Sequence, residues 1–141
     1  MNRILLPVDT IELNEKTYNL SRDLAVKFQA EIIVLSVVQY SDRHSHPQLS
    51  ALLDMRDSHF VEYAHEVVEN ISKRLEAEGV KVQRQVLNGN PAHEIVKFAD
   101  EHQCDMIIMN THSIKSPKRF FAGSITNNVV HHASVPVIVV S

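Results

Sequence analysis

The residues best suited to chemistry lie between Met109 and Ile125, where the chain reads MNTHSIKSPKRFFAGSI. This stretch follows the apolar run Asp105–Met109, which is typical of a buried strand. It ends in Gly123-Ser124, where a helix is predicted to begin. A strand that leads through a polar loop into a helix can bind phosphate, because the helix N-terminus leaves backbone N–H groups unpaired and carries a partial positive charge. Three cations of the stretch would add to this charge: Lys115, Lys118 and Arg119.

Two simpler interpretations of the same stretch stay open. Ser124 could cap the helix without any ligand, because capping and anion binding use the same geometry. The cations could belong to a solvated surface loop, where isolated charges contribute little. The sequence therefore indicates an anion site without excluding a plain helix cap.

The chain shows no residue set typical of an enzyme or a metal site. It has neither the nucleophile elbow of the α/β-hydrolases nor a phosphate-binding loop with its lysine. None of the nine histidines has a second histidine four residues away, and there is one cysteine, Cys104. We therefore expect no catalytic residue, no metal ligand and a reduced, structural Cys104. Any hydrolysis of a bound nucleotide would be slow or incidental.

The composition narrows the class of partner. The net charge is −3 with histidine neutral, which argues against nucleic acid as the main partner. The first apolar run, Ile4–Val8, is too short for a signal-peptide core or a membrane span. We expect a cytoplasmic protein that binds neither nucleic acid nor a membrane.

Apolar runs and helical periodicities alternate along the chain. This alternation predicts an α/β protein with a parallel sheet and helices on both faces, built as a single domain over residues 1–141. The predicted strands are Arg3–Val8, Glu31–Val38, Val80–Leu87 near a sheet edge, Asp105–Met109 and Val135–Val140. The predicted helices are Asn14–Phe28, Leu49–Glu78, Pro91–Gln103 and Ser124–Ala133.

The last predicted strand favours an edge position, because Pro136 lacks the N–H that an inner strand needs. An apolar edge is prone to association unless something covers it. We expect two copies to meet there through Val135, Val137 and Val139. The alternative is that the chain's own helices cover this strand.

Several short motifs, taken in order, resemble the universal stress protein family over essentially the whole chain. The matching segments are Ile4–Asp9, Leu35–Val38, Gly89–Ile95, Asp105–Met109, Thr111-His112, Gly123-Ser124 and Val135–Val140. The resemblance implies a doubly wound five-stranded parallel sheet in the order 3-2-1-4-5, of the adenine-nucleotide α-hydrolase-like type. It also implies a homodimer through the last strand, and many members bind ATP, a ligand that could carry Mg²⁺.

The ATP-binding members of this family carry three glycines around the phosphates, and here those positions are Asn110, Ser113 and Gly123-Ser124. The spacing is kept, but two of the three glycines are replaced. Asn tolerates the left-handed backbone conformation better than most residues, so Asn110 is a mild replacement. Ser113 carries a Cβ that could crowd a phosphate and a hydroxyl that could donate to one. We interpret the site as altered rather than erased.

In a doubly wound sheet, ligands bind beyond the C-terminal strand ends where the strand order reverses. Under the implied order, this crevice lies between the first and fourth strands. There Asp9 could accept hydrogen bonds from ribose or adenine, Val37 could offer its backbone to adenine, and His112 could contact the ligand or hold the loop. The candidate nucleotide-binding residues are Pro7, Val8, Asp9, Val37, Met109, Asn110, His112, Ser113, Gly123, Ser124 and Ile125.

The sequence supports two main functional hypotheses. The first is a dimeric stress-response module that binds ATP or another adenine nucleotide and acts as a sensor toward a protein partner, rather than as an enzyme. The second is a nucleotide-free dimeric interaction protein whose phosphate loop has degenerated. A weak ATPase or phosphotransfer enzyme is a more distant alternative.

Overall fold

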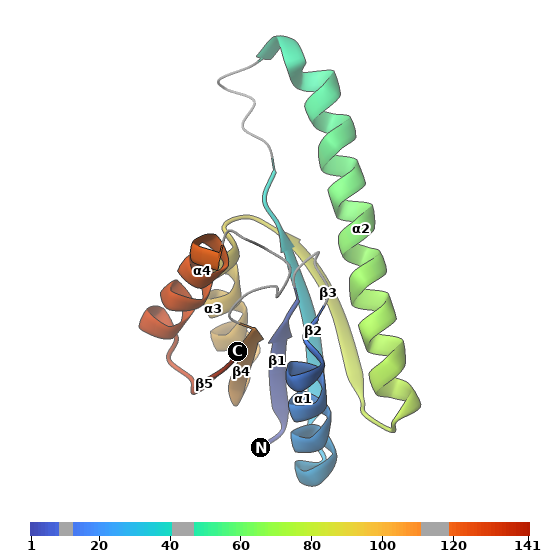
Figure 1. The fold of residues 1–141 in the computed structure, drawn as a ribbon, viewed down its shortest axis with the longest axis vertical. Helices are drawn as coiled ribbons and strands as arrows, with labels where there is room; N and C mark the ends of the chain where they lie inside the picture. Colours follow the sequence, from blue (N-terminus) through green and yellow to red (C-terminus); the bar gives the residue numbers. More distant parts are fainter. Residues whose placement is uncertain (9–12, 41–46, 111–118) are drawn as a thin grey trace.

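A computed structural model of the chain describes residues 1–8, 13–40, 47–110 and 119–141, with the backbone alone for 119–123. Strands and helices alternate along the chain (Figure 1). The strands are β1 (Arg3–Pro7), β2 (Glu31–Val38), β3 (Val82–Asn88), β4 (Met106–Asn110) and β5 (Val137–Val140). The helices are α1 (Glu15–Phe28), α2 (Ser50–Ala77), α3 (Pro91–Glu101) and α4 (Arg119–His132), with a 3-10 turn at Pro47–Leu49.

The strands form one parallel sheet in the order β3-β2-β1-β4-β5. This confirms the predicted fold class and strand order, including the edge positions of β3 and β5. The central strands are continuous apolar runs because both of their faces are buried. In β1, Ile4, Leu5 and Leu6 are all fully buried.

Two hydrophobic clusters lie on opposite faces of the sheet. Along β1, Ile4 and Leu6 belong to a cluster shared with α1 and α2, whereas Leu5 belongs to a cluster shared with α3 and α4. This alternation follows from the two-residue period of a strand. The chain therefore has helices on both faces of the sheet, as predicted.

Side-chain caps define the starts of two helices. The side chain of Asn14 accepts a hydrogen bond from the backbone N–H of Lys16 at the start of α1. The side chain of Asn90 does the same for His93, and Pro91 occupies the first turn of α3. Such caps satisfy N–H groups that have no partner within the helix.

The N-terminal half of α2 differs from the prediction. Its periodicity indicates a buried face, yet four of its large apolar side chains are 37% to 70% exposed: Leu52, Met55, Phe60 and Tyr63. The physical reason is visible in Figure 1, where this half of α2 extends past the end of the sheet and has no strand beneath it. We call residues 50–63 the overhang. The later part of the helix is packed normally, with Ala64, Val68 and Leu75 buried.

No helix in the part of the chain that the structure describes is long and apolar enough to cross a membrane.

Polar contacts join α2 to its neighbours. On the edge strand β3, Arg84 bridges Glu69 and Glu76 of α2 at 2.6 and 2.7 Å. On α1, the buried Tyr18 donates from its hydroxyl to the Glu78 carboxylate, at the C-terminal end of α2. The guanidinium of Arg74 lies 3.8 Å from the centre of the Tyr18 ring. These contacts fix α1 and the C-terminal end of α2 to each other.

The environment of Tyr18 predicts a loss of stability at high pH. Burial, followed by the hydrogen bond to Glu78, raises the pKa of Tyr18 to about 12 from 10.0. Between these values the folded chain keeps a proton that the unfolded chain loses, so the free energy of unfolding should fall as pH rises from 10 to 12. Urea denaturation at several pH values measures this. Tyr18→Phe should weaken the dependence in that window, and an unchanged slope would contradict the assignment.

Candidate functional site

The strand order reverses between β1 and β4, and the pairing of these two strands stops early. The ladder between these strands includes Ile4↔Met106 and Leu5↔Ile107 and ends there, before either strand ends. The Arg3 carbonyl of β1 accepts a hydrogen bond from the backbone N–H of Asp105 and therefore faces β4. The backbone N–H of Val8 donates to the Leu35 carbonyl and therefore faces β2. The alternation of strand residues therefore turns the backbone of Leu5 and Pro7 toward β4.

Pro7 accounts for this early end. Proline has no backbone N–H, so the next donor from β1 toward β4 is missing. The pairing with β2 continues further, to Pro7↔Leu35. The local effect of Pro7 is to open the C-terminal edge on the β4 side while keeping β1 joined to β2.

Val37 presents backbone groups toward the same edge. The backbone of its neighbour Val38 faces β3, because Gly89 donates to the Val38 carbonyl over 3.0 Å. The N–H and C=O of Val37 must therefore face the β1 side, beyond the last pair between β1 and β2. The Val37 side chain packs against the cluster shared with α3 and α4. Val37 thus directs a backbone donor and a backbone acceptor toward the β1 side while its side chain stays in the core.

Asn110 is held by side chains from two helices. The Thr17 hydroxyl of α1 donates to the Asn110 side-chain oxygen, and the Thr126 hydroxyl of α4 lies 3.2 Å from the Asn110 backbone carbonyl, to which it donates. Thr17 is fully buried, and Ser21 donates to its carbonyl one turn later. These hydroxyl groups tie α1 and α4 to the C-terminal end of β4.

The expected reason for tolerating Asn110 is wrong. Asn110 is the last residue of β4 and pairs with Val140, so its backbone is extended. Among the described non-glycine residues, a positive φ occurs at Gln29 and Gln103. Asn110 therefore does not use the left-handed conformation. Its side chain is accommodated because Thr17 binds it.

The predicted start of the last helix is also wrong. α4 begins at Arg119, so Gly123 and Ser124 lie inside the helix, just past its first turn, and not before it. The sequence signal misled because Ser suggests a cap, whereas Arg119 and the residues after it contain no helix breaker until Gly123. Ser124 is consequently not the N-cap, and the unpaired N–H groups belong to the beginning of α4.

The other candidate residues divide into two groups. Val8 and Met109 are buried, and the partly buried Ile125 packs against the cluster shared with α3 and α4, as Met109 does. Asp9, His112 and Ser113 lie outside the described residues, as do the cations Lys115 and Lys118. Among the described residues, no group of three or more His, Cys, Asp or Glu side chains could hold a metal ion.

The predicted association surface lies on β5, which begins at Val137 rather than Val135. Val135 and Val137 are partly buried and pack against the cluster shared with α3 and α4, whereas Val139 is 42% exposed. Pro136 still accepts a hydrogen bond from Ile107 at 2.9 Å, so β5 is joined to β4 from this point onward. Val139 is the one predicted interface residue whose side chain is largely exposed.

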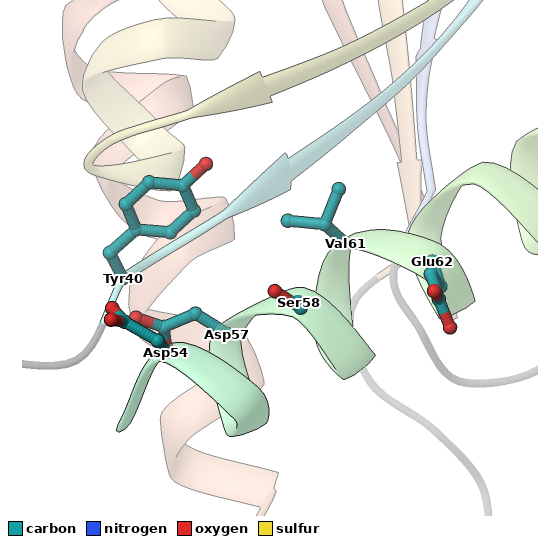
Figure 2. A pocket seen from close by; sticks show the side chains of 6 residues that line it. All are labelled: Tyr40, Asp54, Asp57, Ser58, Val61 and Glu62. Carbon is teal, nitrogen blue, oxygen red and sulfur yellow. The ribbon is translucent and has the colours of Figure 1, made fainter. Parts of the chain in front are cut away.

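The structure contains a hollow that the sequence analysis does not predict. It has a volume of about 580 Å³ and lies between Tyr40, after β2, and the overhang of α2 (Figure 2). Three carboxylates line it: Asp54, Asp57 and Glu62. Their negative charge disfavours a phosphate. Asp54 and Asp57 are three residues apart in the sequence, a helical spacing that could have indicated this face. The hollow is therefore a poor candidate for a nucleotide site.

Comparisons with known proteins agree with this architecture. A model of the universal stress protein family matches residues 1–141. A universal stress protein of Methanocaldococcus jannaschii is 30% identical over 151 residues, covering 98% of this chain and 93% of that protein. The structure of a universal stress protein from Lactobacillus plantarum has a TM-score of 0.85 at 27% identity, covering 99% of this chain and 97% of that one.

A further solved structure shares the fold and holds a ligand. It is a universal stress protein from Archaeoglobus fulgidus in complex with dAMP, with a TM-score of 0.72 at 20% identity. The match covers 100% of this chain and 98% of that chain.

The position of Cys104 predicts an unreactive thiol. Cys104 is buried beside β4, and burial raises its pKa to about 11 from 9.0. At neutral pH this lowers the thiolate fraction roughly a hundredfold, and only the thiolate reacts. Native protein should therefore react with Ellman's reagent at least about a hundredfold more slowly than the urea-unfolded chain. Comparable rates in the two states would show that Cys104 is accessible and activated.

Proposed function

This chain belongs to the universal stress protein family, and we propose that it is a stress-response module that binds ATP or another adenine nucleotide. The proposed site is the crevice beyond the C-terminal ends of β1 and β4. The observation that carries the proposal is the early end of the β1–β4 ladder at Leu5↔Ile107, at the point where the strand order reverses. The dAMP complex of the Archaeoglobus fulgidus protein, which has the same fold, supports an adenine nucleotide as the ligand.

The described residues suggest how each part of the nucleotide is bound. The backbone of Val37 would hydrogen-bond the adenine edge, since its donor and acceptor face the β1 side beyond the last pair between β1 and β2. The start of α4 would attract the phosphates through its unpaired N–H groups and its dipole. Arg119 is the first residue of this helix, so the sequence supplies a cation in its first turn.

The proposed role is sensing rather than turnover. Nucleotide binding would change the surface around the end of β4 and the start of α4, and a protein partner would recognise the bound form. Hydrolysis is not part of the proposal, because the described residues of this edge include no side chain placed to activate water. Binding phosphates without such a group gives little rate acceleration. A dimer of this module in the cytoplasm would present two such sites.

The alternative is a nucleotide-free interaction protein. The observation that favours it is Asn110, which replaces a glycine of the ATP-binding members and adds a side chain at the end of β4. Under this alternative, the contacts of Thr17 and Thr126 with Asn110 would only hold the fold together. Direct binding measurements separate the two functions.

The first test is calorimetric titration of nucleotide-stripped protein with ATP. We expect binding in the wild type and loss of at least about tenfold in affinity in Gly123→Val, because a branched side chain one turn after the start of α4 would crowd phosphates bound at that end. Valine disturbs a helix less than glycine does, so the variant should fold.

The matched control is Asn128→Val, which places the same side chain at an exposed position of α4. This variant should bind ATP as the wild type does. If wild-type protein at millimolar ATP shows no binding heat and no thermal shift, the proposed function is refuted. Unchanged affinity in Gly123→Val would place the ligand elsewhere.

The second test concerns the proposed dimer through β5. Val139→Glu should convert dimers to monomers, because a charge on each copy would be buried or repelled at the joined edges. The side chain is exposed in the single chain, so the fold should tolerate the change. Light scattering coupled to size exclusion measures the mass. Val26→Glu, at an exposed position on α1, is the control and should stay dimeric. A dimeric Val139→Glu would place the interface on another surface.

A further inference from the structure

The contact between Thr17 and Asn110 joins a fully buried hydroxyl to the last residue of β4. Thr17 lies in the first turn of α1 and is 0% exposed. Its hydroxyl donates to the side-chain oxygen of Asn110, and its own carbonyl accepts from Ser21 at 2.8 Å. A buried hydroxyl without a partner is costly, so this arrangement holds the Asn110 side chain in one position.

The direction of the Asn110 side chain follows from the strand. Successive residues of β4 alternate between the two faces of the sheet. Met106 and Ile108 pack in the cluster shared with α1, whereas Ile107 and Met109 pack in the cluster shared with α3 and α4. Asn110 continues this alternation and places its side chain on the α1 face, where Thr17 receives it.

The backbone of the same residue is held from the other helix. Thr126, which is 5% exposed on α4, donates to the Asn110 carbonyl over 3.2 Å. Residue 110 is therefore fixed by its side chain toward α1 and by its carbonyl toward α4. It stands at the C-terminal edge of the sheet, the region in which nucleotide binding is proposed.

We propose that Thr17 is a positioning residue of the nucleotide site: it draws the Asn110 side chain against α1 and so keeps it out of the space through which the phosphates pass. This inference rests on the proposed function. It explains how a chain with asparagine at this position can bind a nucleotide where relatives of the ATP-binding group have glycine. Thr17 does not touch the ligand and acts only through Asn110.

The proposal differs from a purely structural role in one measurable respect. If Thr17 only stabilises α1, removing its hydroxyl harms the protein whatever residue stands at 110. If Thr17 restrains Asn110, the harm to binding disappears once the Asn110 side chain is removed. A double-mutant cycle between the two residues separates these cases.

The experiment measures ATP affinity by calorimetry in the wild type, Thr17→Val, Asn110→Ala and the double variant. Valine keeps the shape of threonine but cannot bind Asn110. We expect Thr17→Val to bind ATP about tenfold more weakly, the effect of losing one restraining hydrogen bond. Asn110→Ala and the double variant should bind ATP with the same affinity as each other, because Thr17 has no Asn110 side chain left to restrain.

Ser21→Ala is the matched control. It removes another fully buried hydroxyl from the same helix, one turn further on, without removing a group that contacts Asn110. Its ATP affinity should equal that of the wild type even if its melting temperature falls. A loss of affinity equal to that of Thr17→Val would show a general effect of loosening α1 and would overturn the proposal.

The remaining outcomes separate a failure of the proposed nucleotide binding from a failure of the proposed role of Thr17. A wild type that binds no ATP overturns the proposed function and this inference with it. If the wild type binds, two results overturn this inference alone: unchanged affinity in Thr17→Val, or a double variant that binds ATP more weakly than Asn110→Ala does. If Thr17→Val does not fold, Thr17→Ala serves in the same comparison.

Discussion

A parallel sheet must be covered by apolar side chains on both faces, and most features of this protein follow from that constraint. The chain meets it by alternating residues of β1, β2 and β4 between two clusters, one shared with α1 and α2 and the other with α3 and α4. Because both faces are covered, the polar backbone groups of the inner strands can meet a ligand only at the strand ends. The need to bury the sheet thus determines where the function can lie.

Small departures from regular strand pairing determine which backbone groups and side chains lie at the C-terminal edge of the sheet. Pro7 removes one donor and ends the pairing of β1 with β4, although β1 remains joined to β2. The backbone of Val37 lies beyond the last pair between β1 and β2. Asn110 is held at the end of β4 by hydroxyl groups from two helices. None of these features requires a charged or reactive side chain. Among the described residues, backbone groups and buried hydroxyls thus shape this edge.

The sequence was sufficient where local chemistry and packing agree. The bounds of β2 match the predicted Glu31–Val38, and Asn14 and Pro91 mark the starts of their helices as expected. It was insufficient where the outcome depends on the rest of the fold. Periodicity cannot show that α2 extends past the end of the sheet, and a Gly-Ser pair cannot show that α4 begins before it. No local signal indicates the contact between Thr17 and Asn110, which lie 93 positions apart. The strand order itself was expected from the family resemblance, not from the pattern of residues.

The overhang of α2 affects how the unfolding of this protein should be interpreted. Its large apolar side chains are already in contact with water in the folded chain, so unfolding hydrates little additional surface there. The heat-capacity increment of unfolding and the slope of stability against denaturant both scale with newly hydrated surface. Both quantities therefore report mainly on the sheet and on the packed part of α2. The first turns of that helix can fray and re-form while calorimetric and denaturant curves stay almost unchanged.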